Sequence, residues 1–120
     1  MSKKHISEVM QPPHSISFSA NVEEAVREMS SIETDALLIR QNEEYSGIFT
    51  KTDLIKLLEK NINPAEVTVS TIMSKPILTL DMDTTVSEAR QKMWDKNIRH
   101  YAVTREKKIV GIISINDLDA

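Results

Sequence analysis

The chain has 120 residues, a formal net charge of -3 and no cysteine. This length suits one domain, or two halves that share a core. The acidic balance argues against nucleic acid as a general partner, because binding to a phosphate backbone needs a basic face. The lack of cysteine excludes disulfides and thiolate chemistry. No apolar run approaches the roughly 20 residues of a membrane span, so we expect a cytoplasmic protein with no membrane partner.

The first half of the chain predicts a helical turn, a strand, a helix, two strands and a second helix. Asn21 is a good N-cap for the first of the two helices, and Val22, Ala25, Val26 and Met29 recur at helical spacing on its apolar face. A polar stretch that contains Pro64 then acts as a connector. The elements are expected at residues 5–10, 16–18, 22–31, 36–40, 46–49 and 51–60.

The second half predicts the same order up to its last helix. A strand is expected at 77–80, a helix capped by Thr85 at 86–95, and a strand pair at 101–104 and 109–113. The sequence then stops shortly after Asp117, so most of the helix equivalent to 51–60 is missing. We expect the N-terminal turn or a partner chain to cover that face, unless the chain is a fragment of something longer.

An internal repeat explains this order. The stretch Gly47-Ile48-Phe49-Thr50-Lys51-Thr52-Asp53 returns as Gly111-Ile112-Ile113-Ser114-Ile115-Asn116-Asp117, and these are the only two glycines of the chain. Upstream, Val9-Met10 with Pro13 matches Ile72-Met73 with Pro76. We call residues 9–13 and 72–76 the two lead-in segments.

The hydroxyl–acid pairs Thr50/Asp53 and Ser114/Asp117 have two compatible interpretations. Each is a capping-box pattern that begins a helix. Each also suits a nucleotide, because a helix N-terminus and a hydroxyl can bind phosphate while a carboxylate accepts both hydrogen bonds of a ribose cis-diol. We expect Asp53 to be an exposed first-turn acid that contributes only about 0.3–1 kcal/mol to stability.

The element order, the Val/Ile-Met-x-x-Pro lead-in and the Gly-h-x-Thr/Ser-x-x-Asp ending together resemble the CBS domain, named after cystathionine β-synthase. A tandem pair resembles a Bateman module. The resemblance implies an α/β (α+β) fold of two β-α-β-β-α repeats related by pseudo-twofold symmetry. Residues 1–120 would form one module, with a first repeat at 5–60, a connector at 61–71 and a second repeat at 72–120.

The resemblance also implies a regulatory function. Modules of this family typically sense AMP, ADP, ATP or S-adenosylmethionine, and they pair through their helices into flat homodimers. The adenosine ligand would lie in the cleft between the repeats and alter the geometry of the dimer. No further cofactor is implied.

The site residues implied by the resemblance form two groups. The Asp53 site would add Ile48, Thr50, Thr52, Lys75, Leu80, Ile98 and Arg99. The Asp117 site would add Ile112, Ser114, Asn116, Ser17 and Thr34. His100 follows Arg99, in a stretch where the family often has basic residues that reach phosphates. The first copy has Asp35 at the position equivalent to Arg99, so we expect phosphorylated ligands to fill the Asp53 site first.

Two other classes of function stay open. A purely structural dimerisation unit would keep both hydroxyl–acid pairs as helix caps and bind no nucleotide. An enzyme is disfavoured, because the sequence has no Gly-x-Ser-x-Gly elbow, no Gly-rich phosphate loop and no cluster of metal ligands. Neither His5 nor His14 has an acid or a second histidine at ligand spacing, so we expect no metal site. Trp94 is interpreted as a packing or dimer contact.

Overall fold

The computed structural model describes residues 3–119, which fold as two compact units. The first-repeat unit is His14–Ile77, and the second-repeat unit combines residues 3–13 with 78–119. Each unit contains a three-stranded sheet with helices, so the mixed fold of two β-α-β-β-α repeats is confirmed. The lead-in segments are exchanged: residues 9–13 belong to the second-repeat unit, and residues 72–76 belong to the first-repeat unit.

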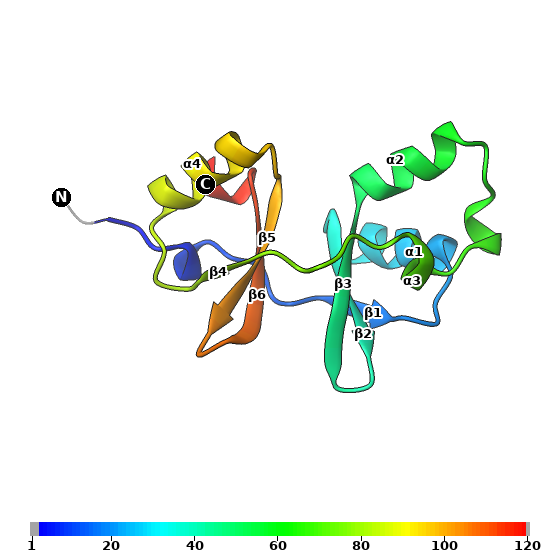
Figure 1. The fold of residues 1–120 in the computed structure, drawn as a ribbon, viewed down its shortest axis with the longest axis horizontal. Helices are drawn as coiled ribbons and strands as arrows, with labels where there is room; N and C mark the ends of the chain where they lie inside the picture. Colours follow the sequence, from blue (N-terminus) through cyan, green and yellow to red (C-terminus); the bar gives the residue numbers. More distant parts are fainter. Residues whose placement is uncertain (1–2, 120) are drawn as a thin grey trace. The chain divides into compact units, whose positions relative to one another are not determined.

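The first-repeat unit is built on the sheet β1-β2-β3 (Figure 1). Strand β1 runs parallel to β2, and β2 is antiparallel to β3. The expected strands and helices are present, with ends shifted by one or two residues, and α3 is an additional helical turn. The bounds are β1 Ser15–Ser17, α1 Val22–Ser31, β2 Ala36–Gln41, β3 Glu44–Thr50, α2 Lys51–Glu59, η2 Pro64–Glu66 and α3 Val69–Ile72.

One face of this sheet carries the core of the unit. Alternate strand residues Leu37, Ile39 and Phe49 are fully buried against the apolar faces of α1, α2 and α3. Helix α1 contributes the predicted apolar stripe and begins at Asn21, whose side chain accepts from Glu24 N at 2.8 Å. Burying an aliphatic or aromatic side chain of this size stabilises the fold by about 1.5–3 kcal/mol.

The second-repeat unit is built on the sheet β4-β5-β6 with the same pairing directions. Helix α4 begins at Thr85, where Glu88 N donates to Thr85 Oγ1 at 3.1 Å. The Thr85 hydroxyl donates to the Glu88 carboxylate in return and lowers its pKa. The bounds are η1 Ile6–Glu8, β4 Thr79–Asp81, α4 Val86–Lys96, β5 His100–Arg105, β6 Lys108–Ser114 and η3 Asp117–Asp119.

The N-terminal turn occupies the place in the second-repeat unit that α3 occupies in the first-repeat unit. Ile6 of η1 is fully buried in the same apolar cluster as Met93 of α4 and Leu118 of η3. Val69 of α3 is the matching buried residue in the first-repeat unit. What covers the face equivalent to that of α2 in the second-repeat unit stays a prediction.

Both glycines lie where a methionine of a lead-in segment crosses the last strand of the sheet. A Cβ atom on Gly47 would lie 2.5 Å from Met73 Sδ, and one on Gly111 would lie 2.6 Å from Met10 Sδ. Neither glycine has a positive φ. The glycines are therefore needed for close approach of the lead-in segment rather than for backbone conformation.

We predict that Gly111→Ala destabilises the protein by about 1–3 kcal/mol through overpacking. Its Cβ would also lie 2.8 Å from the backbone carbonyl of Gln11, which cannot rotate away. Gly47→Ala should cost less, because the backbone oxygen there is 3.0 Å away and the other near atoms belong to the flexible Met73 side chain. Urea unfolding of the two variants measures the difference.

A double variant provides the control. Met73→Ala in the Gly47→Ala background removes the contact with the Met73 side chain. The stability losses of the single variants Gly47→Ala and Met73→Ala should therefore sum to more than the loss in the double variant. A Gly111→Ala protein as stable as the parent would contradict the close-approach explanation.

Candidate functional site

The Asp53 carboxylate joins the first turn of α2 to a lead-in segment. Its Oδ2 accepts from Thr50 N at 2.9 Å and from Thr50 Oγ1 at 3.4 Å. Its Oδ1 accepts from the Ser74 hydroxyl at 2.9 Å. Asp53 is only 9% exposed, so the expectation that it is an exposed first-turn acid is wrong. A helical pattern alone places this side chain at the surface, but the lead-in segment covers it.

The Asp117 carboxylate has the same arrangement in the second-repeat unit. Its Oδ2 accepts from Ser114 N at 2.8 Å and from Ser114 Oγ at 3.1 Å. Its Oδ1 accepts from Gln11 Nε2 at 3.1 Å. The acid half of the predicted capping box is thus present in both copies.

Ser74 and Gln11, the donors from the lead-in segments, are held in place by backbone hydrogen bonds. Ser74 and Ile48 exchange two backbone hydrogen bonds, of 2.8 and 3.0 Å, and Gln11 and Ile112 exchange two of the same lengths. Ser74 and Gln11 occupy equivalent places in the lead-in segments, directly after the methionine. Sequence reasoning missed both residues; the signal was their place between Met and Pro in a duplicated motif.

The first-repeat unit brings one group of predicted residues together. Ile48 and Thr50 close β3, Asp53 follows in α2, and Lys75 comes directly after Ser74. Thr52 and Lys75 are exposed, whereas Ile48 is buried on the sheet face opposite Phe49. In the same unit Thr34 Oγ1 donates to the Ala36 carbonyl at 3.2 Å, and the Ser17 and Ser19 hydroxyls are 2.9 Å apart.

The second-repeat unit holds the other predicted residues. Ile112 and Ser114 are buried in β6, and Asn116 is exposed. Arg99 is exposed, its carbonyl accepts from Ile115 N at 2.9 Å, and His100 pairs with Ser114 in register. Leu80 and Ile98 pack in or against the apolar cluster around Met93. The expected sites that combine residues of both units stay a prediction.

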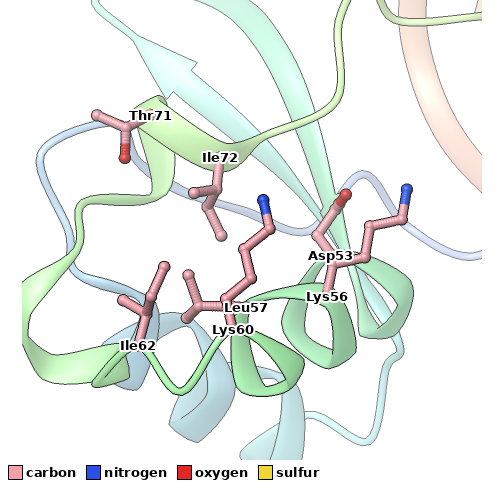
Figure 2. A pocket seen from close by; sticks show the side chains of 7 residues that line it. All are labelled: Asp53, Lys56, Leu57, Lys60, Ile62, Thr71 and Ile72. Carbon is pink, nitrogen blue, oxygen red and sulfur yellow. The ribbon is translucent and has the colours of Figure 1, made fainter.

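A pocket of about 260 Å³ lies beside Asp53 in the first-repeat unit. Figure 2 shows Asp53 and Lys56 at one end of it and Ile62 and Thr71 at the other. Its lining also includes the buried Leu57. The pocket is slightly smaller than usual for small-molecule sites, which measure about 300–1,000 Å³.

Other classes of site find little support among residues 3–119. No group of three or more histidine, aspartate or glutamate side chains could hold a metal ion in this part of the chain. Within the same residues, no helix is long and apolar enough to cross a membrane.

Comparison with known proteins identifies the family. The sequence model of the CBS domain matches residues 6–60 and again 69–119. The chain therefore belongs to the CBS-domain family, as a tandem pair.

Relatives in sequence are longer than the segment that matches this chain. An uncharacterised protein of Methanopyrus kandleri is 36% identical over 84 residues, which cover 68% of this chain and 43% of that protein. A CBS domain-containing protein of Arabidopsis thaliana, CBSCBSPB5, is 35% identical over 100 residues, which cover 81% of this chain and 18% of its own. This chain thus spans less than half the length of either relative.

Solved structures share the fold over nearly the whole chain. A protein of Pyrococcus horikoshii has a TM-score of 0.88 at 30% identity, covering 98% of this chain and 92% of its own. A CBS domain protein of Pyrobaculum aerophilum, solved as a complex with AMP, has a TM-score of 0.81 at 25% identity, covering 94% and 88%. A hexameric CBS-CP12 protein from bloom-forming cyanobacteria has a TM-score of 0.88 at 28% identity, covering 98% and 67%.

We predict that Asp53→Ala lowers the free energy of unfolding by about 1–3 kcal/mol, because it leaves Thr50 N without its side-chain acceptor and removes the partner of Ser74. Asp53→Asn keeps an acceptor oxygen and should cost less. Thermal unfolding of the two variants gives the comparison, with Asp83→Ala as the control at an exposed acid. Equal stability of Asp53→Ala and the parent would contradict a structural role for this carboxylate.

Proposed function

We propose that the chain is a regulatory module that binds an adenosine-containing ligand through the Asp53 and Asp117 carboxylates. The observation that carries this proposal is the fixed position of the two carboxylates in a CBS-domain pair. Each is held at equivalent places by a backbone N–H, a hydroxyl and a side chain of the lead-in segment. A related protein that binds AMP supports the choice of ligand class.

The chemistry around Asp53 suits a nucleoside monophosphate. A carboxylate accepts the hydrogen bonds that a ribose cis-diol donates, while the positive end of α2 and the Thr50 hydroxyl suit a phosphate. The amines of Lys51 and Lys75 are exposed, and no ion pair is present at either lysine in the described part of the chain. They supply cations near the start of the helix.

The ligand would act by shifting an equilibrium between arrangements of the module. It can bias that equilibrium only by the difference between its affinities for the two arrangements. No step of this function requires a chemical reaction. The cytoplasmic location stays a prediction from the sequence.

A structural dimerisation unit is the second candidate. It is favoured by one observation: both carboxylates already have hydrogen-bond donors on each oxygen, without a ligand. In that case the two hydroxyl–acid pairs would serve only to close their turns and to hold the lead-in segments in place.

A thermal shift separates the two candidates. AMP at 100 times its Kd should stabilise the native protein by about 2.7 kcal/mol, whereas a structural unit shows no shift. Titration calorimetry with AMP then gives the affinity, and Asp53→Asn should lower it strongly. An unchanged affinity in that variant would refute the ribose role of Asp53.

We predict that the two sites differ in their affinity for AMP. The Asp53 site has the cation Arg99, whereas the Asp117 site has the anion Asp35 at the equivalent position. The anion disfavours a phosphate at the Asp117 site, since unit charges about 4 Å apart interact by about 4 kcal/mol at an effective dielectric near 20. Asp53→Asn should therefore cost more AMP affinity than Asp117→Asn. Equal losses, or a larger loss in Asp117→Asn, would contradict this order.

We further predict that the chain forms a homodimer through α2. Ile55 and Leu58 lie one turn apart on this helix and are 53% and 50% exposed, an apolar face that a second copy would cover. Light scattering should give twice the 13.6 kDa mass of one chain. Ile55→Glu with Leu58→Glu should give monomers, whereas Lys107→Glu with Lys108→Glu in the hairpin turn should not. A monomeric parent protein would remove the prediction.

A further inference from the structure

The two lead-in segments differ in the one side chain that reaches each carboxylate. Ser74 donates a hydroxyl to Asp53 Oδ1 at 2.9 Å, and Gln11 donates an amide N–H to Asp117 Oδ1 at 3.1 Å. The backbones of the two segments are held identically, by paired hydrogen bonds to Ile48 and to Ile112. The two equivalent carboxylates thus have different hydrogen-bond donors from their lead-in segments.

Both carboxylates are too fully occupied to receive a ribose without a rearrangement. An ionised carboxylate has about four lone-pair positions for hydrogen bonds. Three donors occupy Asp53, and three occupy Asp117. A cis-diol that donates two hydrogen bonds needs two free positions, so one present donor must leave. The backbone N–H groups of Thr50 and Ser114 begin the following turns and cannot leave without opening them.

The Asp53 carboxylate can release a donor with little movement. Its longest hydrogen bond, 3.4 Å from Thr50 Oγ1, is the weakest of the three. The Ser74 hydroxyl turns about a single side-chain torsion. A hydroxyl also accepts hydrogen bonds, so Ser74 can stay on the carboxylate and accept from the ligand at the same time.

The Asp117 carboxylate holds its hydroxyl donor more closely than Asp53 does. Its hydroxyl donor, Ser114 Oγ, is 3.1 Å away and buried with the strand. The Gln11 Nε2 atom that faces the carboxylate can only donate, so unlike the Ser74 hydroxyl it cannot accept from the ligand while it stays there. Releasing Gln11 requires its longer side chain to swing away as a whole.

We infer that the residue after the methionine of each lead-in segment sets how readily the neighbouring carboxylate accepts a diol. Gln11 makes the Asp117 carboxylate less able to accept a diol, whereas Ser74 leaves the Asp53 carboxylate able to do so. The inference rests on the proposed function, since it concerns the ligand preference of the same carboxylates. It is independent of the charges at positions 35 and 99, so it applies to uncharged adenosine as well as to AMP.

Reciprocal exchange of the two side chains tests the inference with adenosine as the probe. In an Asp53→Asn background, which leaves the Asp117 site, Gln11→Ser should raise the adenosine affinity about three- to tenfold, the value of one hydrogen bond. In an Asp117→Asn background, Ser74→Gln should lower the affinity by a similar factor. Titration calorimetry gives both values.

Two control variants apply the same exchanges at exposed positions that touch neither carboxylate: Gln41→Ser and Ser87→Gln. Both should leave the adenosine affinity unchanged. Circular dichroism and thermal unfolding confirm that every variant is folded. In the parent protein, adenosine at saturating concentration should shift the side-chain NH₂ resonances of Gln11 in an ¹⁵N correlation spectrum, because the amide leaves Asp117.

The outcomes separate this inference from the proposed function. Adenosine binding that depends on Asp53 but is unchanged by both exchanges would overturn the inference and leave the proposed function standing. A lower affinity on both exchanges would also overturn it, because it would show a packing effect. Failure of the folded parent protein to bind adenosine or AMP would overturn the proposed function, and the inference with it.

Discussion

The close approach between each methionine and the glycine of the last strand is the constraint on which the remaining structure depends. The strand can receive the lead-in segment only because positions 47 and 111 have no side chain. The approach brings the segment into backbone pairing with the strand, and that pairing sets Ser74 and Gln11 against the carboxylates. A methyl group at either glycine acts on the candidate site through this chain of contacts, although neither glycine touches it.

The hydroxyl–acid motif combines stability and recognition in one side chain. A carboxylate that closes a helical turn is held in place, which lowers the entropic cost of ordering it for a ligand. The same hydrogen bonds use up the acceptor positions that a ligand needs. The donor from the lead-in segment, Ser74 or Gln11, therefore decides how many acceptor positions the fixed carboxylate keeps for a ligand. This donor comes from a distant part of the sequence.

Much of the fold could be predicted from the sequence, because the duplication repeats every local signal. The Asn21 cap, the apolar stripe of α1 and the two strand pairs follow from residue type and spacing, and the structure has them within one or two residues. Helix α3 was missed, since the four residues Val69–Ile72 are too short for a periodic pattern. The burial of Asp53 was missed as well, because it depends on a segment that lies 21 residues further along the chain.

The exchange of lead-in segments has a consequence for how the protein can be made and divided. Asp117 is hydrogen-bonded to a residue 106 positions away, so the second-repeat unit can be completed only after Asp117 itself has left the ribosome. The first-repeat unit is continuous and is complete once Ile77 has emerged. A fragment cut at the limit of the first sequence repeat, after Lys60, contains neither unit whole, whereas a fragment of residues 14–77 contains one. The repeat that evolution duplicated and the unit that folds are thus different pieces of the same chain.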